Sequence, residues 1–321
     1  MSLLELDNIV VEFPTRRGPL EAVKGLSLDL DEGEILGLVG ESGAGKSITG
    51  AAITGLIEPP GLIRSGEVRL RGARIDNLPA DKMRRIRGKE IGAIFQDPLT
   101  SLNPVYTVGE QLVDTMRVHL GLDQKTARQR AIDWLAEVGI PAPEARLDQY
   151  PHQFSGGMRQ RVVIALALCA EPKLIIADEP TTALDVSVQA QILSLLKRLC
   201  RENGTAVVLV THDMGVIAET ADRVAVMYAG RLVEIGDVKQ VIEEPLHPYT
   251  RGLMASIPQI GIRDRRLTQI EGAMPGLRNP APGCAFAPRC PRAMDHCHSI
   301  RPAPQDAGTG QVACHLYGET S

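Results

Sequence analysis

The chain has 321 residues, of which 44% are apolar, 23% are charged and 3% are aromatic, and its formal net charge is -4. This length allows one large domain or two ordinary ones with a sizeable core, and the few aromatics and the lack of a basic excess argue against a nucleic-acid-binding surface. The start MSLLELDNIVVEF lacks a basic signal region, and the apolar run at residues 162–170 is about half of a membrane span, so we expect a cytoplasmic protein without a disulfide framework.

Short, continuous apolar runs predict strands that are buried on both faces of a mainly parallel sheet. These runs are ILGLV at residues 35–39, LIIA at 174–177 and AVVLV at 206–210. A glycine loop and a helix-compatible stretch follow the first run, and a helix from residue 186 to a stop at Asn203 and Gly204 joins the other two. This alternation of strands and helices predicts an α/β fold.

Other segments depart from that alternation. Residues 97–163 are helical and polar, with KTARQRAIDWLAEVGI as the clearest amphipathic helix, and predict a helical insertion. RVAVMYAGRLVEIGD at 223–237 predicts a hairpin that turns at Ala229 and Gly230. From about residue 258, proline, glycine and arginine dominate and periodicity fades. We therefore expect a main domain at 1–257 and a small, loop-rich C-terminal extension at 258–321.

Residues 40–47, GESGAGKS, match the phosphate-loop pattern G-x-x-x-x-G-K-S. The glycines leave backbone N–H groups free to wrap the α- and β-phosphates of ATP, Lys46 reaches the β- and γ-phosphates, and Ser47 can ligate Mg²⁺. The predicted ATP-binding loop comprises Gly40, Glu41, Ser42, Gly43, Ala44, Gly45, Lys46 and Ser47.

An acidic pair follows the second predicted strand. Asp178 ends LIIAD, a position from which a carboxylate can hold Mg²⁺, and Glu179 beside it is a candidate base for the attacking water. An Asp-Glu pair at a strand end is weak evidence by itself. Together with the phosphate loop, it indicates hydrolysis of a nucleotide.

Five further positions, in the expected order, resemble ATP-binding cassette proteins. FSGGMRQR at 154–161 resembles the family signature, and Gln96 in IFQDP, Asp185 in TTALD and His212 in VTHD resemble its Q-loop, D-loop and switch histidine. Phe13 stands where the family stacks an aromatic ring on adenine. The resemblance covers residues 1 to about 250. It implies a RecA-like parallel-sheet core with an antiparallel β subdomain and a helical insertion.

The resemblance also implies roles for these residues in a head-to-tail dimer of cassettes. Ser155, Gly156 and Gly157 would contact the γ-phosphate of ATP bound by the partner chain. Glu179 would polarise the attacking water, and His212 would contact the γ-phosphate and the opposite D-loop, which in this chain contains Asp185. The implied Mg²⁺ ligands are Ser47, Gln96 and Asp178, and the implied catalytic residues are Lys46, Gln96, Glu179 and His212. Met158 departs from the family, because many members have glutamine there.

Three stretches resemble the ATPases of bacterial dipeptide and oligopeptide importers: QDPLTSLNPVYTVGEQL, PHQFSGGMRQR and PLHPYTRGLMASIP. The implied partners are a second cassette, homologous but a different chain, two membrane permease subunits and, indirectly, an extracytoplasmic substrate-binding protein, without nucleic acid. The implied location is the cytoplasmic face of the bacterial plasma membrane. Alternatives are import of nickel, glutathione or another small solute, a non-transport cassette of DNA repair or translation, and a metal or redox sensor in the tail.

Four cysteines in the C-terminal extension form the pattern C-x5-C-x6-C-x16-C: Cys284, Cys290, Cys297 and Cys314. Their segment is too short and too poor in apolar residues to fold well without a stabilising cross-link such as a bound metal. Four thiolates suit an iron–sulfur cluster or tetrahedral zinc, and His296, His298 and His315 keep a mixed zinc site possible.

The resemblance to peptide-importer ATPases, some of which hold a [4Fe-4S] cluster in this extension, favours a structural iron–sulfur cluster. Zinc and unligated thiols are the alternatives. Cys169 and Cys200 lie in apolar helices and are expected to be core or boundary residues.

Overall fold

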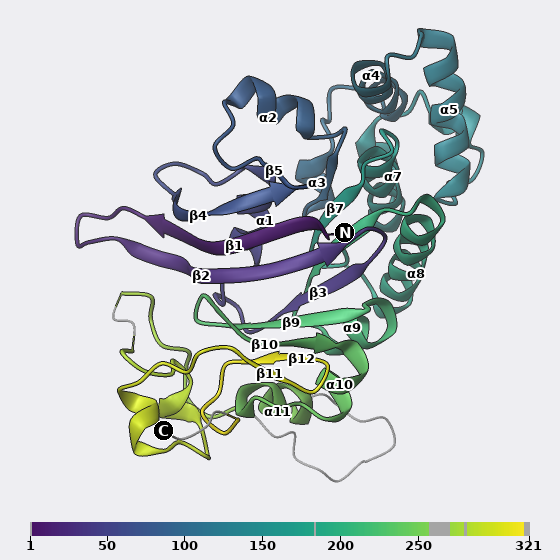
Figure 1. Cartoon of the computed structure of the whole chain (residues 1–321). Helices are drawn as coiled ribbons and strands as arrows, with labels where there is room; N and C mark the ends of the chain where they lie inside the picture. The colour runs from purple at the N-terminus through teal and green to yellow at the C-terminus, as the bar shows by residue number, and fades with distance from the viewer. Residues whose placement is uncertain (1, 183, 257–269, 279–280, 318–321) are drawn as a thin grey trace. The chain divides into compact units, whose positions relative to one another are not determined.

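The computed structural model describes residues 2–182, 184–256, 270–278 and 281–317 (Figure 1). The chain forms two compact units, each considered by itself below. The first comprises residues 31–34 and 77–209, and the second comprises 2–30, 35–76 and the described part of 210–321. Within the described residues, no helix combines the length and the apolar content needed to span a bilayer.

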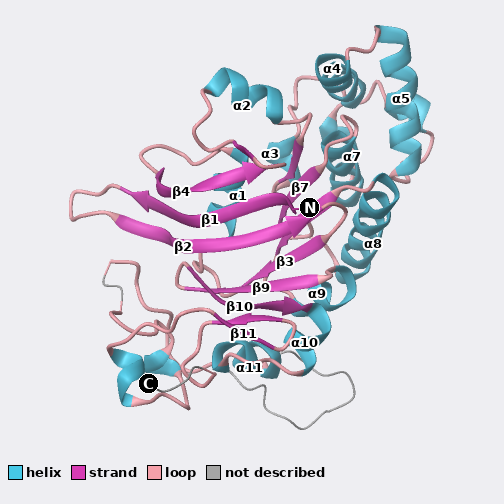
Figure 2. Cartoon of the chain, viewed as in Figure 1, coloured by secondary structure: helices cyan, strands magenta, loops and turns pink. Residues whose placement is uncertain are grey.

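The second unit contains an antiparallel sheet in the order β2-β1-β4-β5 (Figure 2). Its strands are β1 (Ser2–Phe13), β2 (Leu20–Asp31), β4 (Leu62–Leu70) and β5 (Ala73–Arg74). Along most of β2, buried and exposed residues alternate, as expected for a strand with one face on a core. This sheet is the antiparallel subdomain that the family resemblance implies.

A further set of strands in the second unit runs in the order β11-β12-β10-β9-β3. β3 (Ile35–Val39) is fully buried and pairs in parallel with β9 (Arg223–Tyr228), which pairs antiparallel with β10 (Arg231–Asp237). Ala229 and Gly230, between β9 and β10, have φ angles of 49° and 84°. Two successive left-handed residues fit a type I′ hairpin turn, so the predicted hairpin is confirmed.

The C-terminal extension adds two strands that the sequence analysis did not predict. β12 (Gly310–Val312) pairs antiparallel with β10, and β11 (Gln305–Ala307) pairs with β12. The other elements of this unit are α1 (Lys46–Thr54), α9 (Met214–Thr220), α10 (Val238–Glu243), α11 (Pro248–Ala255) and the 3₁₀ turns η2 (Ala287–Arg289) and η3 (Asp295–His298). The predicted boundary at residues 257 and 258 lies outside the described residues.

The first unit has the strand order β6-β7-β8. β6 (Ile91–Ile94) is parallel to β7 (Leu174–Asp178), and β8 (Ala206–Val210) is completely buried. The helices are α2 (Ala80–Ile86), α3 (Pro98–Ser101), α4 (Val108–Leu120), α5 (Gln124–Glu137), α6 (Pro143–Arg146), α7 (Gly156–Leu168) and α8 (Val186–Asn203), with the 3₁₀ turn η1 (Pro151–Gln153).

Local side-chain bonds fix where the longer helices of this unit begin. Thr107 and Glu110 form a reciprocal capping box at α4, and Asp123 accepts hydrogen bonds from the first amides of α5. α8 ends at Gly204 in the left-handed region, where the sequence predicts its stop. Cys169 and Cys200 are fully buried, which confirms their predicted place in the core.

Candidate nucleotide site and cysteine pocket

The phosphate loop connects β3 to α1 and is held by its own lysine. Lys46 is only 6% exposed, and its Nζ donates hydrogen bonds to the carbonyl oxygens of Gly40 at 2.8 Å and Glu41 at 3.1 Å. Gly45 has a φ of 104°, and a Cβ there would lie 2.7 Å from the carbonyl oxygen of Ala22. The loop therefore needs glycine at this position both for its backbone angle and for the close approach of a neighbouring strand.

Glu41, at a position that the phosphate-loop pattern leaves open, has partners far along the chain. Its two carboxylate oxygens accept hydrogen bonds from Nη1 of Arg289 at 3.1 and 3.0 Å. Its backbone N–H donates to the hydroxyl of Tyr249 at 2.9 Å. Sequence reasoning missed both partners, because they follow Glu41 by 248 and 208 residues and belong to no common motif.

An aromatic cluster supports these partners of Glu41. The ring centroid of Tyr228 lies 4.6 Å from that of Tyr249 and 5.3 Å from that of Phe286. All three side chains are almost completely buried. Burial raises the pKa of both tyrosines, so each keeps a neutral hydroxyl group. Arg289 donates to the hydroxyl of Tyr228 at 3.1 Å, which joins the C-terminal extension to the end of β9.

In the other unit, the predicted base and the predicted Q-loop residue are in contact. Oε2 of Glu179 accepts hydrogen bonds from Nε2 of Gln96 at 3.1 Å and from the hydroxyl of Thr182 at 2.9 Å. Glu179 follows Asp178, the last residue of β7, and has a φ of 45°. A non-glycine residue in this left-handed region is uncommon and is often found at functional sites. Thr182 was not predicted, because a single hydroxyl in EPTT gives no distinct signal.

The signature forms the start of α7. The Ser155 hydroxyl accepts a hydrogen bond from the Met158 amide at 3.4 Å and so caps the helix. Ser155 and Gly156 are exposed. A helix N-terminus with exposed amides and a hydroxyl favours an anion such as phosphate. Met158, the departure from the family pattern, lies behind this exposed end in the first turn.

The signature and the D-loop residue belong to neighbouring helix starts. A Cβ at Gly157 would lie 3.0 Å from Cγ1 of Val188, in the first turn of α8. Asp185 caps α8 by accepting a hydrogen bond from the Val188 amide at 2.9 Å, and this bond contributes most to a lowered pKa of its carboxyl group. The first unit thus brings together Gln96 with Glu179, and the signature with Asp185.

The two remaining predicted residues lie in the second unit. His212 is exposed and directly precedes Asp213, whose carboxylate caps α9 by accepting from the Gly215 amide at 2.8 Å. Phe13 ends β1, and its ring is packed so closely over Gly61 that a Cβ there would clash with it. The second unit therefore holds the phosphate loop, Phe13 and His212.

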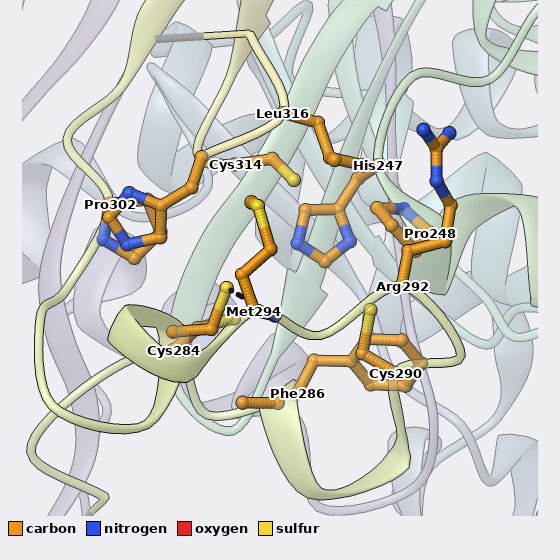
Figure 3. Close-up of a pocket in the computed structure, with 13 residues that line it drawn as sticks. His247, Pro248, Cys284, Phe286, Cys290, Arg292, Met294, Pro302, Cys314 and Leu316 are labelled. Carbon is orange, nitrogen blue, oxygen red and sulfur yellow. Dashed lines mark hydrogen bonds between the residues drawn. The ribbon is translucent and has the colours of Figure 1, made fainter. Parts of the chain in front are cut away.

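Four cysteines, widely spaced in the sequence, line one pocket in the C-terminal extension: Cys284, Cys290, Cys297 and Cys314. Figure 3 shows three of them, Cys284, Cys290 and Cys314, around the ring of His247. Burial raises the pKa of these three thiols. Binding of a metal would have to displace their protons, as is usual for thiolate sites.

The His247 side chain provides a test of whether this pocket suits a thiophilic metal group. Its Nδ1 accepts a hydrogen bond from the Tyr249 amide at 3.0 Å, so the neutral ring carries its proton on Nε2. Burial lowers the pKa of His247 to about 4, which favours the neutral ring. Nε2 is buried and has no hydrogen-bond partner among the described residues. Four sulfur ligands and one buried N–H donor fit a metal group with anionic sulfur.

A second set of ligand atoms lies at the same end of the chain. One nitrogen each of His296 and His315 and the sulfur of Cys297 lie within 4.8 Å of one another. The two imidazole rings meet edge to face, with centroids 4.7 Å apart. Two of the three histidines that the sequence analysis placed beside the cysteines thus share a cluster with Cys297, and His298 is not part of it.

Comparison with protein families identifies the class of protein. Residues 23–182 match the family model described as ABC transporter, and residues 233–297 match the model described as oligopeptide/dipeptide transporter, C-terminal region. A solved dimeric structure of the ATP-binding cassette MJ0796 in a post-hydrolysis state, bound to ADP and Pi, is 31% identical, with a TM-score of 0.66, over 73% of this chain and 98% of that one. These findings define an ABC-type ATPase and confirm the predicted fold class.

The similar curated proteins narrow this class to the ATPases of peptide transport. The dipeptide transport ATP-binding protein DppD of Bacillus subtilis is 50% identical over 94% of this chain and 90% of its own length. The oligopeptide transport ATP-binding protein AppD of the same organism is 48% identical over 99% and 98%. The Escherichia coli DppD is 46% identical over 98% and 97%. The chain belongs to the family of ATP-binding subunits of dipeptide and oligopeptide ABC transporters.

Proposed function

We propose that the chain hydrolyses ATP to drive the import of dipeptides or oligopeptides from the cytoplasmic face of a bacterial plasma membrane. It works as one of two cassettes beneath two membrane permease subunits, and the second cassette is a homologous, different chain. An extracytoplasmic binding protein delivers the substrate. The observation that carries this proposal is the match of both the cassette and the C-terminal region to peptide-transport ATPases over nearly the whole chain.

The bound nucleotide is held by the second unit. Phe13 stacks on the adenine, and the amides of residues 40–47 surround the phosphates, which also meet the positive N-terminal end of α1. Lys46 exchanges its bonds to the loop carbonyls for bonds to the β- and γ-phosphates. Until ATP binds, the two hydrogen bonds to these carbonyls hold the ammonium group in the loop.

Hydrolysis uses the acidic pair of the first unit. Glu179 orients and polarises the attacking water, while Gln96 and Thr182 both donate hydrogen bonds to Oε2 of its carboxylate. By the family resemblance, Ser47, Gln96 and Asp178 would hold Mg²⁺, which would neutralise charge on the phosphates. His212 contacts the γ-phosphate.

A partner cassette completes each ATP site. Ser155 is exposed at the start of α7, and Gly156 and Gly157 add amides without side chains, so this end is suited to the γ-phosphate of ATP on the other chain. Asp185 caps the neighbouring helix α8, and by the family resemblance its loop would meet His212 of the opposite chain. One chain alone therefore has all the required residue types but only half of each composite site.

Transport in proteoliposomes tests this function. The chain is co-purified with two permease subunits and a second cassette, and uptake of labelled dipeptides and tripeptides is measured with a peptide-loaded binding protein. We expect ATP-dependent peptide uptake that is lost in Glu179→Gln, which keeps the size of the side chain but removes the base. Uptake of Ni²⁺ or glutathione without peptide would identify the alternative cargo. Failure to associate with any permease would support the non-transport alternative.

We also propose that the C-terminal extension is a separate segment that follows the cassette at about residue 258 and is stabilised by a bound metal group. The ligands are Cys284, Cys290, Cys297 and Cys314, and the group is one structural [4Fe-4S] cluster. Support comes from the four thiols that line one pocket and from His247, which also lines it and whose Nε2–H has no partner among the described residues and would suit an anionic sulfur.

Zinc is the second candidate, because His296 and His315 place two nitrogens within 4.8 Å of the Cys297 sulfur. The two can be separated by metal content after anaerobic purification. The cluster predicts iron and acid-labile sulfide, broad visible absorbance, and their loss in Cys290→Ser but not in the double variant His296→Gln/His315→Gln. Stoichiometric zinc that is lost in the histidine variant would favour the mixed site, and metal-free protein would leave the thiols unligated.

A further inference from the structure

Two hydrogen-bonded connections join the phosphate loop to the wall of the cysteine pocket. The first runs through Arg289, the last residue of η2 and the neighbour of Cys290. Its side chain is 7% exposed, and Nη1 donates to both carboxylate oxygens of Glu41 and to the Tyr228 hydroxyl. Nε and Nη2 donate to two backbone carbonyls at 2.9 and 3.2 Å. All of its donor groups are therefore engaged, and the guanidinium has one orientation.

The second connection runs through Tyr249 on α11. Its hydroxyl accepts the backbone N–H of Glu41 at 2.9 Å, and its own backbone N–H donates to Nδ1 of His247 at 3.0 Å. His247 lines the pocket of the four cysteines, and its other ring nitrogen is buried without a hydrogen-bond partner among the described residues. Glu41 is thus linked to the pocket twice. Its backbone N–H is linked through Tyr249 and His247, and its carboxylate is linked through Arg289.

Glu41 also determines how the rest of the phosphate loop is arranged. Its carbonyl oxygen accepts from Nζ of Lys46 at 3.1 Å and from the Ala44 amide at 3.1 Å. A shift of Glu41 would therefore disturb both the lysine and the Ala44 amide. Its carboxylate, if unpaired, would also repel the phosphates of ATP, and Arg289 removes that repulsion by pairing with it.

We propose that Arg289 and Tyr249 are positioning residues for the phosphate loop, and that through them the ATP affinity of this chain depends on the state of the cysteine pocket. The part that concerns Arg289 and Tyr249 requires only that the chain binds ATP. The dependence on the pocket rests on the proposed function, because it requires a bound metal group whose loss changes the pocket. Because the cysteine pocket and the phosphate loop are separate sites, the coupling between them has to be measured directly.

The first experiment measures the dissociation constant of Mg-ATP in the full-length chain, with Glu179→Gln as the common background to prevent turnover. We expect Arg289→Gln to raise the constant by about 10-fold or more, because a paired charge in the loop is lost. Arg289→Lys keeps the charge and should recover part of the affinity. Arg278→Gln, at an exposed arginine of the same segment, is the matched control and should bind like the background protein.

A double-variant cycle tests the contact itself. Glu41→Gln removes the carboxylate that Arg289 neutralises, so the combination of Glu41→Gln with Arg289→Gln should bind ATP better than the sum of the two single effects predicts. Tyr249→Phe removes only the hydroxyl and should raise the dissociation constant without unfolding the chain. Independent, additive effects, or an Arg289→Gln protein that binds as tightly as Arg278→Gln, would refute the positioning role.

The pocket is tested from its far end with Cys314→Ser, which leaves η2 unchanged. We expect a raised dissociation constant for Mg-ATP and faster amide exchange in residues 40–47, and little further loss when Arg289→Gln is added. Normal affinity in Cys314→Ser, despite loss of its metal, would refute the dependence on the pocket. Metal content measured on the same samples separates this failure from a failure of the metal assignment, since Arg289→Gln should then still act in metal-free protein.

Discussion

The hydroxyl of Thr182 offers a direct test of how the proposed catalytic carboxylate, that of Glu179, is positioned. Thr182→Val keeps the shape of the side chain but removes its hydrogen bond of 2.9 Å to Oε2 of Glu179. A hydrogen bond to a charged group contributes about 1.5–3 kcal/mol. The side chain is only partly buried, so the lower figure applies. If the bond serves to orient the base, about 1.5 kcal/mol corresponds to a roughly 10-fold lower kcat.

The assay is steady-state ATP turnover by the assembled transporter at varied Mg-ATP concentration. We expect Thr182→Val to lower kcat and leave KM nearly unchanged, because the phosphate loop keeps all its contacts. Thr182→Ser retains the hydroxyl and is the matched control. Equal kcat values for the two variants, or a raised KM with normal kcat in Thr182→Val, would show that the hydroxyl does not orient Glu179. Urea unfolding of both variants checks that the fold is intact.

Three further changes test other parts of the structure. Gly45→Ala should abolish nucleotide binding in equilibrium dialysis, because the new Cβ would lie 2.7 Å from a backbone oxygen, whereas Gly72→Ala, with no atom within 4 Å, should retain it. Asp185→Ala should lower the free energy of unfolding in urea by about 1 kcal/mol through loss of the helix cap, and Asp185→Asn should lower it less. Burial raises the pKa of Cys169 and Cys200 to about 12, so mass spectrometry should find both unmodified after a short pulse of N-ethylmaleimide on folded protein and modified in urea.

The elements that the sequence predicted correctly are those whose signal is local. ILGLV, LIIA and AVVLV are continuous apolar runs, and each is a strand in the structure. The hairpin at Ala229 and Gly230 and the end of α8 at Gly204 depend on backbone angles that particular residues adopt readily. Such features need only neighbouring residues to specify them, so no knowledge of tertiary contacts is required.

The missed features depend on contacts between distant residues. β11 and β12 have three residues each, too few for a periodic pattern, and they form because Val312 and Gln311 pair with β10. The contact between Arg289 and Glu41 could not be predicted either, because the two residues are 248 positions apart and belong to no common motif. Motif spacing predicted residues for ATP binding, but it gave no signal for supporting side chains such as Thr182, which donates a hydrogen bond to Glu179.

The pairing of Arg289 with Glu41 has a consequence for which substitutions evolution can accept at these two positions. The motif G-x-x-x-x-G-K-S leaves the position of Glu41 free, yet in this chain its carboxylate neutralises an arginine that is otherwise enclosed. A neutral residue at 41 would leave that guanidinium buried without its counter-ion, which is costly. We therefore expect substitutions at 41 and 289 to occur together among relatives. Which residues are tolerated at position 41 of the motif then depends on the residue at position 289 in the C-terminal extension.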